Sequence, residues 1–183
     1  MTPFVDKITA VDLQLSAAGV EHAFGGAICL GFHVESPRAT ADIDVNITAD
    51  PGTGRQVLAA LPSEVVWDES DVAQIARSGQ ARVFWDRTPL DLFFRQHALH
   101  GVVASRVQHV AFAGRQLPIL SATDLAIFKS LCDRPRDWAD IAAMLEYGQV
   151  DVVEVRRWLT TLVGAEDQRG RRFEELARTT PLA

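Results

Sequence analysis

Residues 41–47, with the sequence ADIDVNI, alternate apolar and polar side chains without interruption. Successive side chains of a β-strand point to opposite faces of the sheet, so this pattern predicts a half-buried strand. Asp42 and Asp44 are then on one face, while Ile43 and Val45 are on the other. Carboxylates held this close repel each other unless a cation lies between them, and their oxygens are ligands that suit Mg²⁺. The segment therefore predicts a strand that carries two candidate metal ligands.

The patterning of the first two thirds of the chain predicts further strands and helices. Gly25-Gly26 forms the turn between an expected strand at 22–24 and a short helix at 27–32. Strands at 81–85 and 89–94 are expected to pair antiparallel through a turn at 86–88. The other elements expected here are helices at 4–18, 51–61 and 69–76 and a strand at 107–112, with Ala113-Gly114 as its turn.

From Ser121 onward the patterning becomes helical. Helices are expected over 121–132, with Ser121 as N-cap, and over 135–146, 151–163 and 167–178. The sequence thus predicts an α+β (mixed α/β) fold, a small mixed β-sheet flanked by helices with a C-terminal helical part. We expect the core to span residues 1–115 and the helical region to span 116–183.

Composition places the chain among globular proteins: of its 183 residues, 48% are hydrophobic and 23% are charged. No run approaches the roughly 18 apolar residues of a membrane span, and the first ten residues lack a basic stretch followed by an apolar one. The two cysteines, Cys29 and Cys132, have no metal-ligand spacing around them and suit a reducing compartment. We therefore expect a cytoplasmic protein with no membrane partner.

Charge is unevenly distributed along the chain. Residues 1–91 hold 6 Lys and Arg against 13 Asp and Glu, while residues 92–183 hold 12 against 11. The acidic first half argues against nucleic-acid binding over the whole surface, although the Arg-rich second half could still face a phosphate-bearing ligand.

Two more features extend the candidate site. Asp91 lies between two leucines on a second expected strand, and if that strand neighbours the first, three carboxylates converge as in a two-metal site. The glycines at Gly25-Gly26 would let the backbone approach a ligand closely, and the start of the following helix offers N–H groups to an anion such as a triphosphate.

These residues resemble the signature of the DNA polymerase β-like nucleotidyltransferase superfamily, in which a Gly-Gly or Gly-Ser turn precedes an Asp-x-Asp strand. The match runs from Gly25-Gly26 to the segment 38–45, RATADIDV. The tail segments 120–129, LSATDLAIFK, and 134–141, RPRDWADI, are similar to motifs of its AbiEii-type branch, which includes toxins of bacterial toxin-antitoxin systems. The resemblance covers roughly residues 22–145.

The resemblance implies a role for each matched residue. Gly25 and Gly26 would hold the nucleotide phosphates, with Arg38 and Thr40 also on the nucleotide-binding side. Asp42, Asp44 and Asp91 would bind Mg²⁺, with two ions expected, and Asp91 could instead take the proton from an attacking hydroxyl. Lys129 would contact the triphosphate, and Asp137 or Asp140 would complete the far wall of the cleft. The matched residues named here as candidates are Gly25, Gly26, Arg38, Thr40, Asp42, Asp44, Asp91, Lys129, Asp137 and Asp140.

The resemblance implies a Mg²⁺-dependent nucleotidyltransferase, which moves a nucleoside monophosphate from an NTP to an acceptor hydroxyl and releases pyrophosphate. It favours a toxin whose acceptor is RNA, such as the 3′ end of tRNA, or a protein side chain, with a cognate antitoxin as partner. One alternative is an antibiotic-modifying nucleotidyltransferase, whose cleft walls would be acidic rather than lined by arginine. Another is a catalytically silent nucleotide-binding module, in which Asp91 would point away from Asp42 and Asp44.

Simpler structural explanations stand beside these roles. An Asp-x-Asp strand can be a solvated face, and a helical lysine such as Lys129 is usually exposed. Asp137 and Asp140 could be acids favoured at a helix start or paired with Arg134 and Arg136. The HxxH spacing of His97 and His100 lacks a third metal ligand, so surface helix positions are expected. The arginines of the last helices fit exposed helix faces or contacts to RNA phosphates; they are Arg156, Arg157, Arg169, Arg171, Arg172 and Arg178.

Overall fold

The protein is described by a computed structural model, which covers residues 2–181. It has two compact units. The first unit contains the chain up to Ile28 and then Ala39–Ile119, and the second contains Cys29–Arg38 and the chain from Leu120 onward. A short excursion at Cys29–Arg38 therefore belongs with the C-terminal helices, although it lies early in the sequence.

The first unit is built on one sheet. Its strands are β1 (His22–Phe24), β2 (Ile43–Ile47), β3 (Val65–Val66), β4 (Gln80–Trp85), β5 (Thr88–Phe94), β6 (Gln108–Phe112) and β7 (Arg115–Ile119). Its helices are α1 (Phe4–Ala17), the 3-10 turn η1 (Pro51–Thr53), α3 (Gly54–Ala59), α4 (Glu69–Ser78) and α5 (Ala98–Ala104). Helix α2 (Gly26–Leu30) leads from this unit into the Cys29–Arg38 segment.

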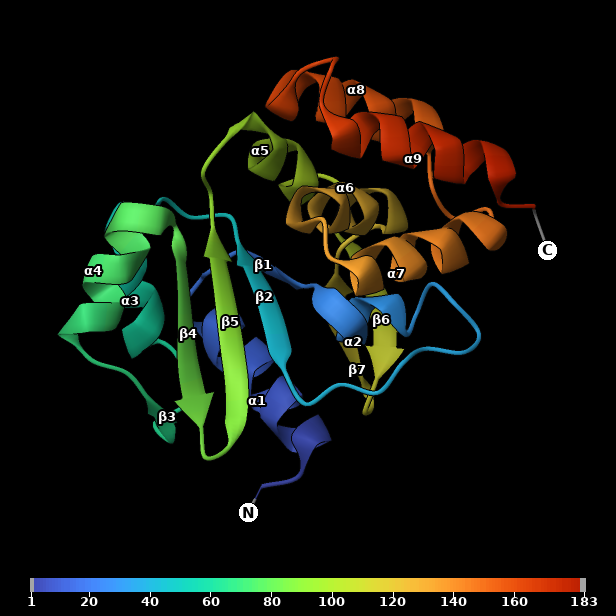
Figure 1. Cartoon of the computed structure of the whole chain (residues 1–183). Helices are drawn as coiled ribbons and strands as arrows, with labels where there is room; N and C mark the ends of the chain where they lie inside the picture. The colour runs from blue at the N-terminus through green and yellow to red at the C-terminus, as the bar shows by residue number, and fades with distance from the viewer. Residues whose placement is uncertain (1, 182–183) are drawn as a thin grey trace. The chain divides into compact units, whose positions relative to one another are not determined.

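The sheet is mixed, with the strand order β3-β4-β5-β2-β1-β7-β6. Strands β2 and β5 are parallel, as are β1 and β7, and the remaining neighbours are antiparallel. Strands β4, β5 and β2 therefore lie side by side, although β2 comes from a part of the sequence distant from the β4–β5 hairpin (Figure 1). This central trio carries the candidate site.

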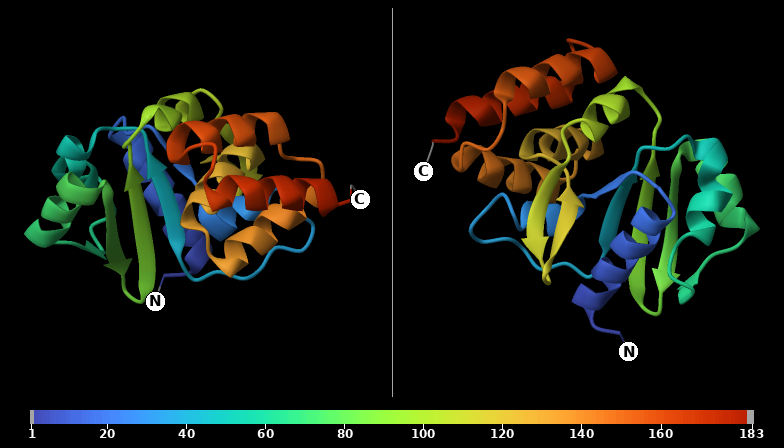
Figure 2. Two further views of the ribbon diagram at one scale, coloured as in Figure 1. Left: turned by 45° about the horizontal axis from the view of Figure 1, so that its top comes forward. Right: turned by 180° about the vertical axis from the view of Figure 1, so that it is seen from behind.

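Alternation along β4 separates a buried face of the sheet from an open one. Ala81, Val83 and Trp85 are buried, whereas the residues between them are exposed. Helix α1 crosses one face of the sheet (Figure 2) and buries apolar residues such as Val11. Its buried Lys7 donates hydrogen bonds to the end of β4 and the turn after it, so α1 is tied to the sheet by polar contacts as well as by its apolar stripe.

The second unit contains four helices in the described part of the chain: α6 (Ala122–Cys132), α7 (Pro135–Glu146), α8 (Val152–Val163) and α9 (Gln168–Thr179). Their starts follow from the sequence. The Ser121 side chain accepts a hydrogen bond from the Asp124 amide at 3.1 Å, as expected for an N-cap, and Asp151 and Asp167 cap α8 and α9 in the same way. Pro135 occupies the first turn of α7, where its missing N–H costs nothing.

The predicted fold class is confirmed, since the structure is a mixed sheet flanked by helices. Two elements were absent from the prediction: the two-residue strand β3 and strand β7, whose residues Arg115–Ile119 pair with β1 and β6. Helix α5 was expected only as a helix that carries His97 and His100, without bounds. The expected helix at 51–61 is shorter and begins as a 3-10 turn. The expectation that His100 lies on the surface is wrong, because this side chain is buried in α5.

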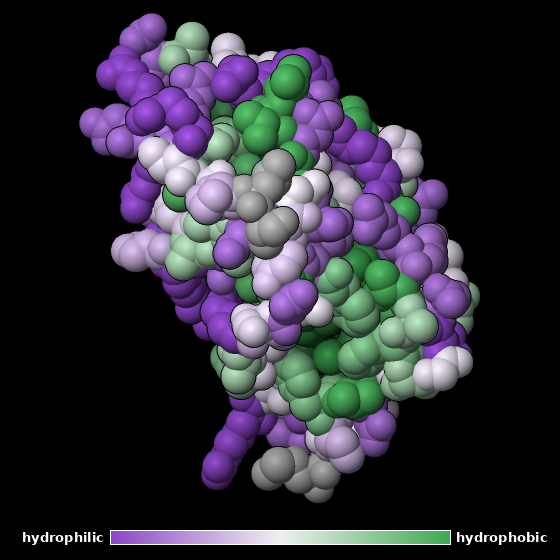
Figure 3. All heavy atoms as spheres, turned by 90° about the vertical axis from the view of Figure 1, so that its right-hand side faces the viewer, coloured by the Kyte–Doolittle hydropathy of each residue, from purple (hydrophilic) through white to green (hydrophobic). Residues whose placement is uncertain are grey.

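The surface carries both polar and hydrophobic residues. Figure 3 shows hydrophobic residues gathered on part of one face, with hydrophilic residues over much of the rest. Large apolar side chains that stay in solvent include Val66 and Val153. Of the two cysteines, Cys29 is buried and Cys132 is exposed. No helix within residues 2–181 is both long and apolar enough to cross a membrane.

Candidate active site

Three adjacent strands bring an acidic pair and an arginine into one row. Asp44 on β2 is the register partner of Asp91 on β5, and Asp91 is the register partner of Arg82 on β4. Register partners on neighbouring strands have side chains on the same face of a sheet, about 5 Å apart. Asp42 lies two residues before Asp44, so its side chain points to the same face. The structure therefore brings together the three carboxylates that the sequence proposed, and it places the positively charged Arg82 side chain among them.

Arg82 holds Asp91 through two hydrogen bonds. Its Nε donates to one carboxylate oxygen at 2.7 Å and its terminal nitrogen to the other at 2.6 Å. The same terminal nitrogen lies 3.9 Å from the nearer carboxylate oxygen of Asp42. The hydrogen bonds that Arg82 donates to Asp91, and the negative charge of Asp91, raise the pKa of Arg82 above its ordinary value. Arg82 is thus a permanent positive charge between two of the proposed metal ligands.

The glycine turn packs directly against the Asp-x-Asp strand. The Gly25 amide donates to the Asp44 carbonyl oxygen at 2.9 Å, which fixes the turn to β2. Gly26 has a φ of +54°, in the left-handed region that favours glycine, and a Cβ there would fall 1.8 Å from Oδ2 of Asp44. Thr40, two residues before Asp42, exchanges hydrogen bonds with the Asp42 backbone at 3.2 and 3.3 Å. The backbone around the acidic pair is therefore held on both sides.

These residues fit one divalent cation better than two. Asp42 and Asp44 offer oxygen-only ligands on one strand face, and the missing Cβ of Gly26 leaves room for the Asp44 carboxylate itself. Both oxygens of Asp91 already accept from Arg82. Within residues 2–181, no group of three or more His, Cys, Asp or Glu side chains has the arrangement of a metal site.

The tail residues of the second unit form a buried ionic cluster of their own. The Lys129 ammonium donates to Asp140 at 2.5 Å and to Asp137 at 3.3 Å. Arg134 binds Asp137 from the other side, with its Nε 2.6 Å from the carboxylate, and Arg38 donates to Asp140 at 3.2 Å. Lys129 is therefore buried and paired with both candidate tail acids rather than with one of them.

The charges of this cluster compensate each other. Burial alone would raise the pKa of Asp137, but the hydrogen bond from Arg134 and the charges of Lys129 and Arg134 outweigh burial, so the pKa of Asp137 lies below its ordinary value. The ion pair of Asp137 with Arg134 agrees with the simpler explanation that this acid pairs with a neighbouring arginine. Asp137 also pairs with Lys129, which that explanation did not include. Arg38, which the resemblance placed near the nucleotide, contributes to this cluster through Asp140.

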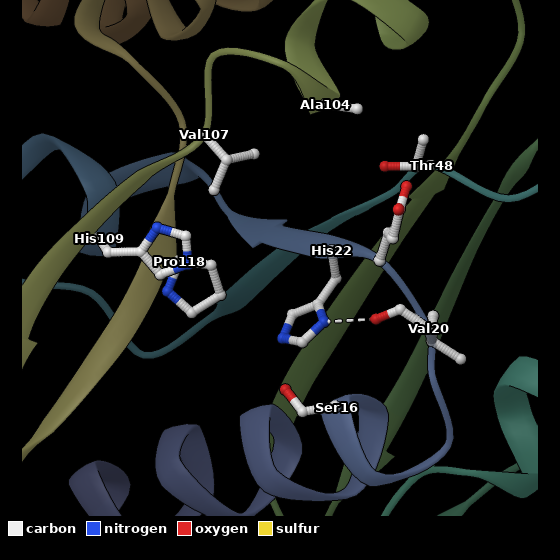
Figure 4. Close-up of a pocket in the computed structure, with 9 residues that line it drawn as sticks. Ser16, Val20, His22, Thr48, Ala104, Val107, His109 and Pro118 are labelled. Carbon is white, nitrogen blue, oxygen red and sulfur yellow. Dashed lines mark hydrogen bonds between the residues drawn. The ribbon is translucent and has the colours of Figure 1, made fainter.

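The first unit has a separate pocket at the other end of β2. His22, which lines it, is the register partner of Ile47, whereas Asp42 and Asp44 lie at the start of the strand. Nδ1 of His22 is 2.8 Å from the Val20 carbonyl oxygen, a contact drawn as a dashed line in Figure 4, and Nε2 is 3.2 Å from the buried Asp12. The pocket also includes His109 and Thr48 and is distinct from the carboxylate row.

The arginines of the last two helices are largely ion-paired on the surface. Arg156 lies 2.9 Å from Glu174 and Arg157 lies 2.7 Å from Glu154, and both arginines are about half exposed. Arg171 pairs with Glu166. These contacts agree with the expectation of exposed helix faces.

Among the functional candidates, Arg82 was missed by the sequence reasoning. The hairpin of β4 and β5 could have revealed it, because Trp85 pairs with Thr88 at its turn. The residue three positions before Trp85 then pairs with the residue three positions after Thr88, which places Arg82 opposite Asp91. The expected turn at 86–88 was one residue too long for that count.

Similarity to known proteins is visible only in three dimensions. No protein-family model matches the chain, and no curated protein matches its sequence. An antigenic nucleotidyltransferase-like protein from Paracoccidioides brasiliensis superposes with a TM-score of 0.55 at 16% identity, over 97% of this chain and 94% of that one. The antibiotic-resistance factor ANT(2'')-Ia reaches 0.47 at 15% identity, over 95% and 89% of the two chains. JHP933 from Helicobacter pylori reaches 0.44 at 14% identity, over 94% and 87%. The first of these matches, with its TM-score above 0.5, shows that the chain has a nucleotidyltransferase-like fold.

Proposed function

We propose that the protein is a Mg²⁺-dependent nucleotidyltransferase that uses an NTP as donor. The observation that carries this proposal is the packing of Gly26 against the carboxylate of Asp44, next to Asp42 and in register with Asp91. A close glycine turn beside an acidic strand is what the sequence signature requires, and the nucleotidyltransferase-like fold supports it.

Asp42 and Asp44 are the residues proposed to hold Mg²⁺. When bound, Mg²⁺ would neutralise phosphate charge and assist departure of the pyrophosphate. In the reaction, an acceptor hydroxyl oxygen forms a bond to the α-phosphorus as the bond to the bridging oxygen of the leaving pyrophosphate breaks. The hydroxyl proton passes to a carboxylate or to water. Asp91 is the carboxylate that we propose to orient the hydroxyl, because its oxygens keep lone pairs beyond those used by Arg82.

The acceptor that we propose is an RNA 3′ hydroxyl, with tRNA as the first candidate and a protein hydroxyl as the second. This part rests on the resemblance of the tail motifs to AbiEii-type toxins, and it implies a cognate antitoxin. A cationic aminoglycoside is a competing acceptor, favoured by the acidic character of the site: Asp42, Asp44 and Asp91 face one arginine.

The test is transfer of label from each α-³²P-NTP in turn, with Mg²⁺ and purified tRNA, bacterial lysate protein or an aminoglycoside as acceptor. We expect labelled tRNA with the unaltered chain and a loss of at least about 100-fold in an Asp42→Asn/Asp44→Asn variant. Asp6→Asn is the matched control, since it removes an exposed carboxylate at the start of α1 and should keep full activity.

The acceptor arms separate the alternatives. Label in protein or in the drug would keep nucleotidyl transfer and replace the acceptor. Label of equal strength in the double variant would refute the proposed metal ligands. If none of the acceptors becomes labelled with any NTP, the silent nucleotide-binding module becomes the better explanation.

A further inference from the structure

The proposed function gives no role to Arg82. Arg82 lies in the middle of the carboxylate row and makes a two-pronged contact with Asp91, at 2.6 and 2.7 Å. Arginine is suited to such contacts because its planar fork matches the two oxygens of a carboxylate. The Asp91 side chain is only 16% exposed, whereas that of Arg82 is 52% exposed, so the arginine covers the acid from the solvent side.

A second divalent cation at Asp91 would have to compete with this guanidinium. Each Asp91 oxygen already accepts a charge-assisted hydrogen bond, and the arginine's positive charge would repel a metal ion placed beside it. Arg82 cannot relieve the conflict by losing its proton, because guanidinium stays charged in proteins.

Charge balance agrees with a single ion. The three carboxylates Asp42, Asp44 and Asp91 carry a formal charge of −3, and Arg82 reduces it to −2, which one divalent cation neutralises. Asp42 and Asp44 are the ligands proposed for that ion, and Arg82 approaches Asp42 to 3.9 Å without the fork contact that it makes with Asp91.

We propose that Arg82 is a built-in cation that occupies the place of a second metal ion at Asp91, so that the chain by itself binds one divalent ion through Asp42 and Asp44. The inference rests on the proposed function, since it takes Asp42 and Asp44 as metal ligands. It assigns to Arg82 a positioning role, in which the arginine holds the Asp91 carboxylate in a fixed orientation.

The hairpin geometry makes this arrangement specific. Arg82 and Asp91 are register partners across β4 and β5, which are joined by a turn of two residues, Asp86 and Arg87. Asp86 adopts a φ of +52°, a conformation that aspartate tolerates better than most residues. A shift of one residue in this register would turn the arginine to the other face of the sheet.

The experiment counts bound Mn²⁺ on the full-length chain by electron paramagnetic resonance, without nucleotide. We expect one ion per chain for the unaltered protein and two for Arg82→Gln. Adding Asp91→Asn to Arg82→Gln should return the count to one. Arg87→Gln removes an exposed arginine from the same hairpin and should leave the count at one.

The outcomes separate this inference from the proposed function. Two ions on the unaltered chain, or an unchanged count of one in folded Arg82→Gln, would overturn the inference and leave the metal site intact. If Arg82→Gln does not fold, Arg82→Lys replaces it, since lysine keeps the charge and loses the fork. Arg82→Lys should bind one Mn²⁺ per chain, and Arg82→Lys/Asp91→Asn should also bind one. Binding of one ion with unchanged affinity by the Asp42→Asn/Asp44→Asn variant would refute the proposed metal ligands instead.

Discussion

Gly26 and Asp44 are packed so closely that a Cβ at Gly26 would lie 1.8 Å from Oδ2 of the Asp44 carboxylate. The contact joins a turn at the end of β1 to the start of the neighbouring strand β2, and the hydrogen bond from the Gly25 amide to the Asp44 carbonyl fixes it. The glycine therefore determines where an essential carboxylate of the proposed site can lie.

Gly26→Ala should displace the Asp44 carboxylate and strain the backbone. The positive φ alone costs about 1–2 kcal/mol for a residue with a Cβ, and the clash with Asp44 adds to it. We expect loss of nucleotidyl transfer together with a lower free energy of unfolding, measured by label transfer and by urea denaturation.

Gly101→Ala provides the comparison for this substitution. Gly101 lies inside α5, and a Cβ there meets nothing within 4 Å. Alanine is favoured over glycine in a helix by about 1 kcal/mol, so this variant should be as stable as the original chain or more stable, with unchanged transfer. Equal behaviour of the two variants would contradict the role given to Gly26.

Lys129→Met should destabilise the chain strongly. The substitution leaves the buried carboxylates of Asp137 and Asp140 without their shared cation, and breaking a buried ion pair costs about 3–5 kcal/mol. Urea denaturation followed by circular dichroism measures the loss. Arg171→Ala, which removes an exposed pair with Glu166, should change stability by less than about 1 kcal/mol. A similar small change for Lys129→Met would show that the cluster is not a stabilising unit.

Lys7→Met should loosen the attachment of α1 to the β4–β5 hairpin. The buried ammonium donates to the Trp85 carbonyl oxygen at 2.9 Å, to Thr88 at 3.0 Å and to Asp86 at 3.2 Å. The substitution removes all three hydrogen bonds from this charged donor, at a cost of about 1–3 kcal/mol. Hydrogen exchange should speed up in residues 80–94 more than in α8, and uniform protection in both regions would argue against this attachment.

Stability should fall as the pH is lowered from about 6.5 toward 4, because of His100. Burial and the nearby charge of His97 lower the pKa of His100 to about 4, while in the unfolded chain it would be near 6.5. Between these values the unfolded chain takes up the proton more readily, so protonation favours unfolding. The expected contribution is on the order of 1–2 kcal/mol after allowance for solvent screening.

The His100→Asn variant isolates this effect from other groups that titrate in acid. Urea midpoints at pH 7 and pH 5 should differ more for the original chain than for the variant. Equal differences in both proteins would mean that His100 is not the group responsible.

The sequence by itself determined whether most segments form helices or strands, and which of these elements carry the candidate residues. The alternation at 41–47 placed Asp42 and Asp44 on one face, and the N-cap at Ser121 marked the start of α6, because both signals depend on backbone periodicity and local hydrogen bonds. The mixed sheet flanked by helices followed from the same signals. Local patterns missed β7, whose five residues show no clear alternation and whose pairing with β1 joins distant segments.

Only the tertiary structure decided what surrounds each candidate residue. The turn at Asp86-Arg87 is one residue shorter than expected, and because a one-residue shift changes every cross-strand partner, the pairing of Arg82 with Asp91 was hidden. The enclosure of Lys129 between Asp137 and Asp140 depends on the packing of α6 against α7, and the burial of His100 depends on what covers α5. Spacing along a chain fixes which residues share an element, but charge pairing and burial arise between elements, where no single segment carries the information.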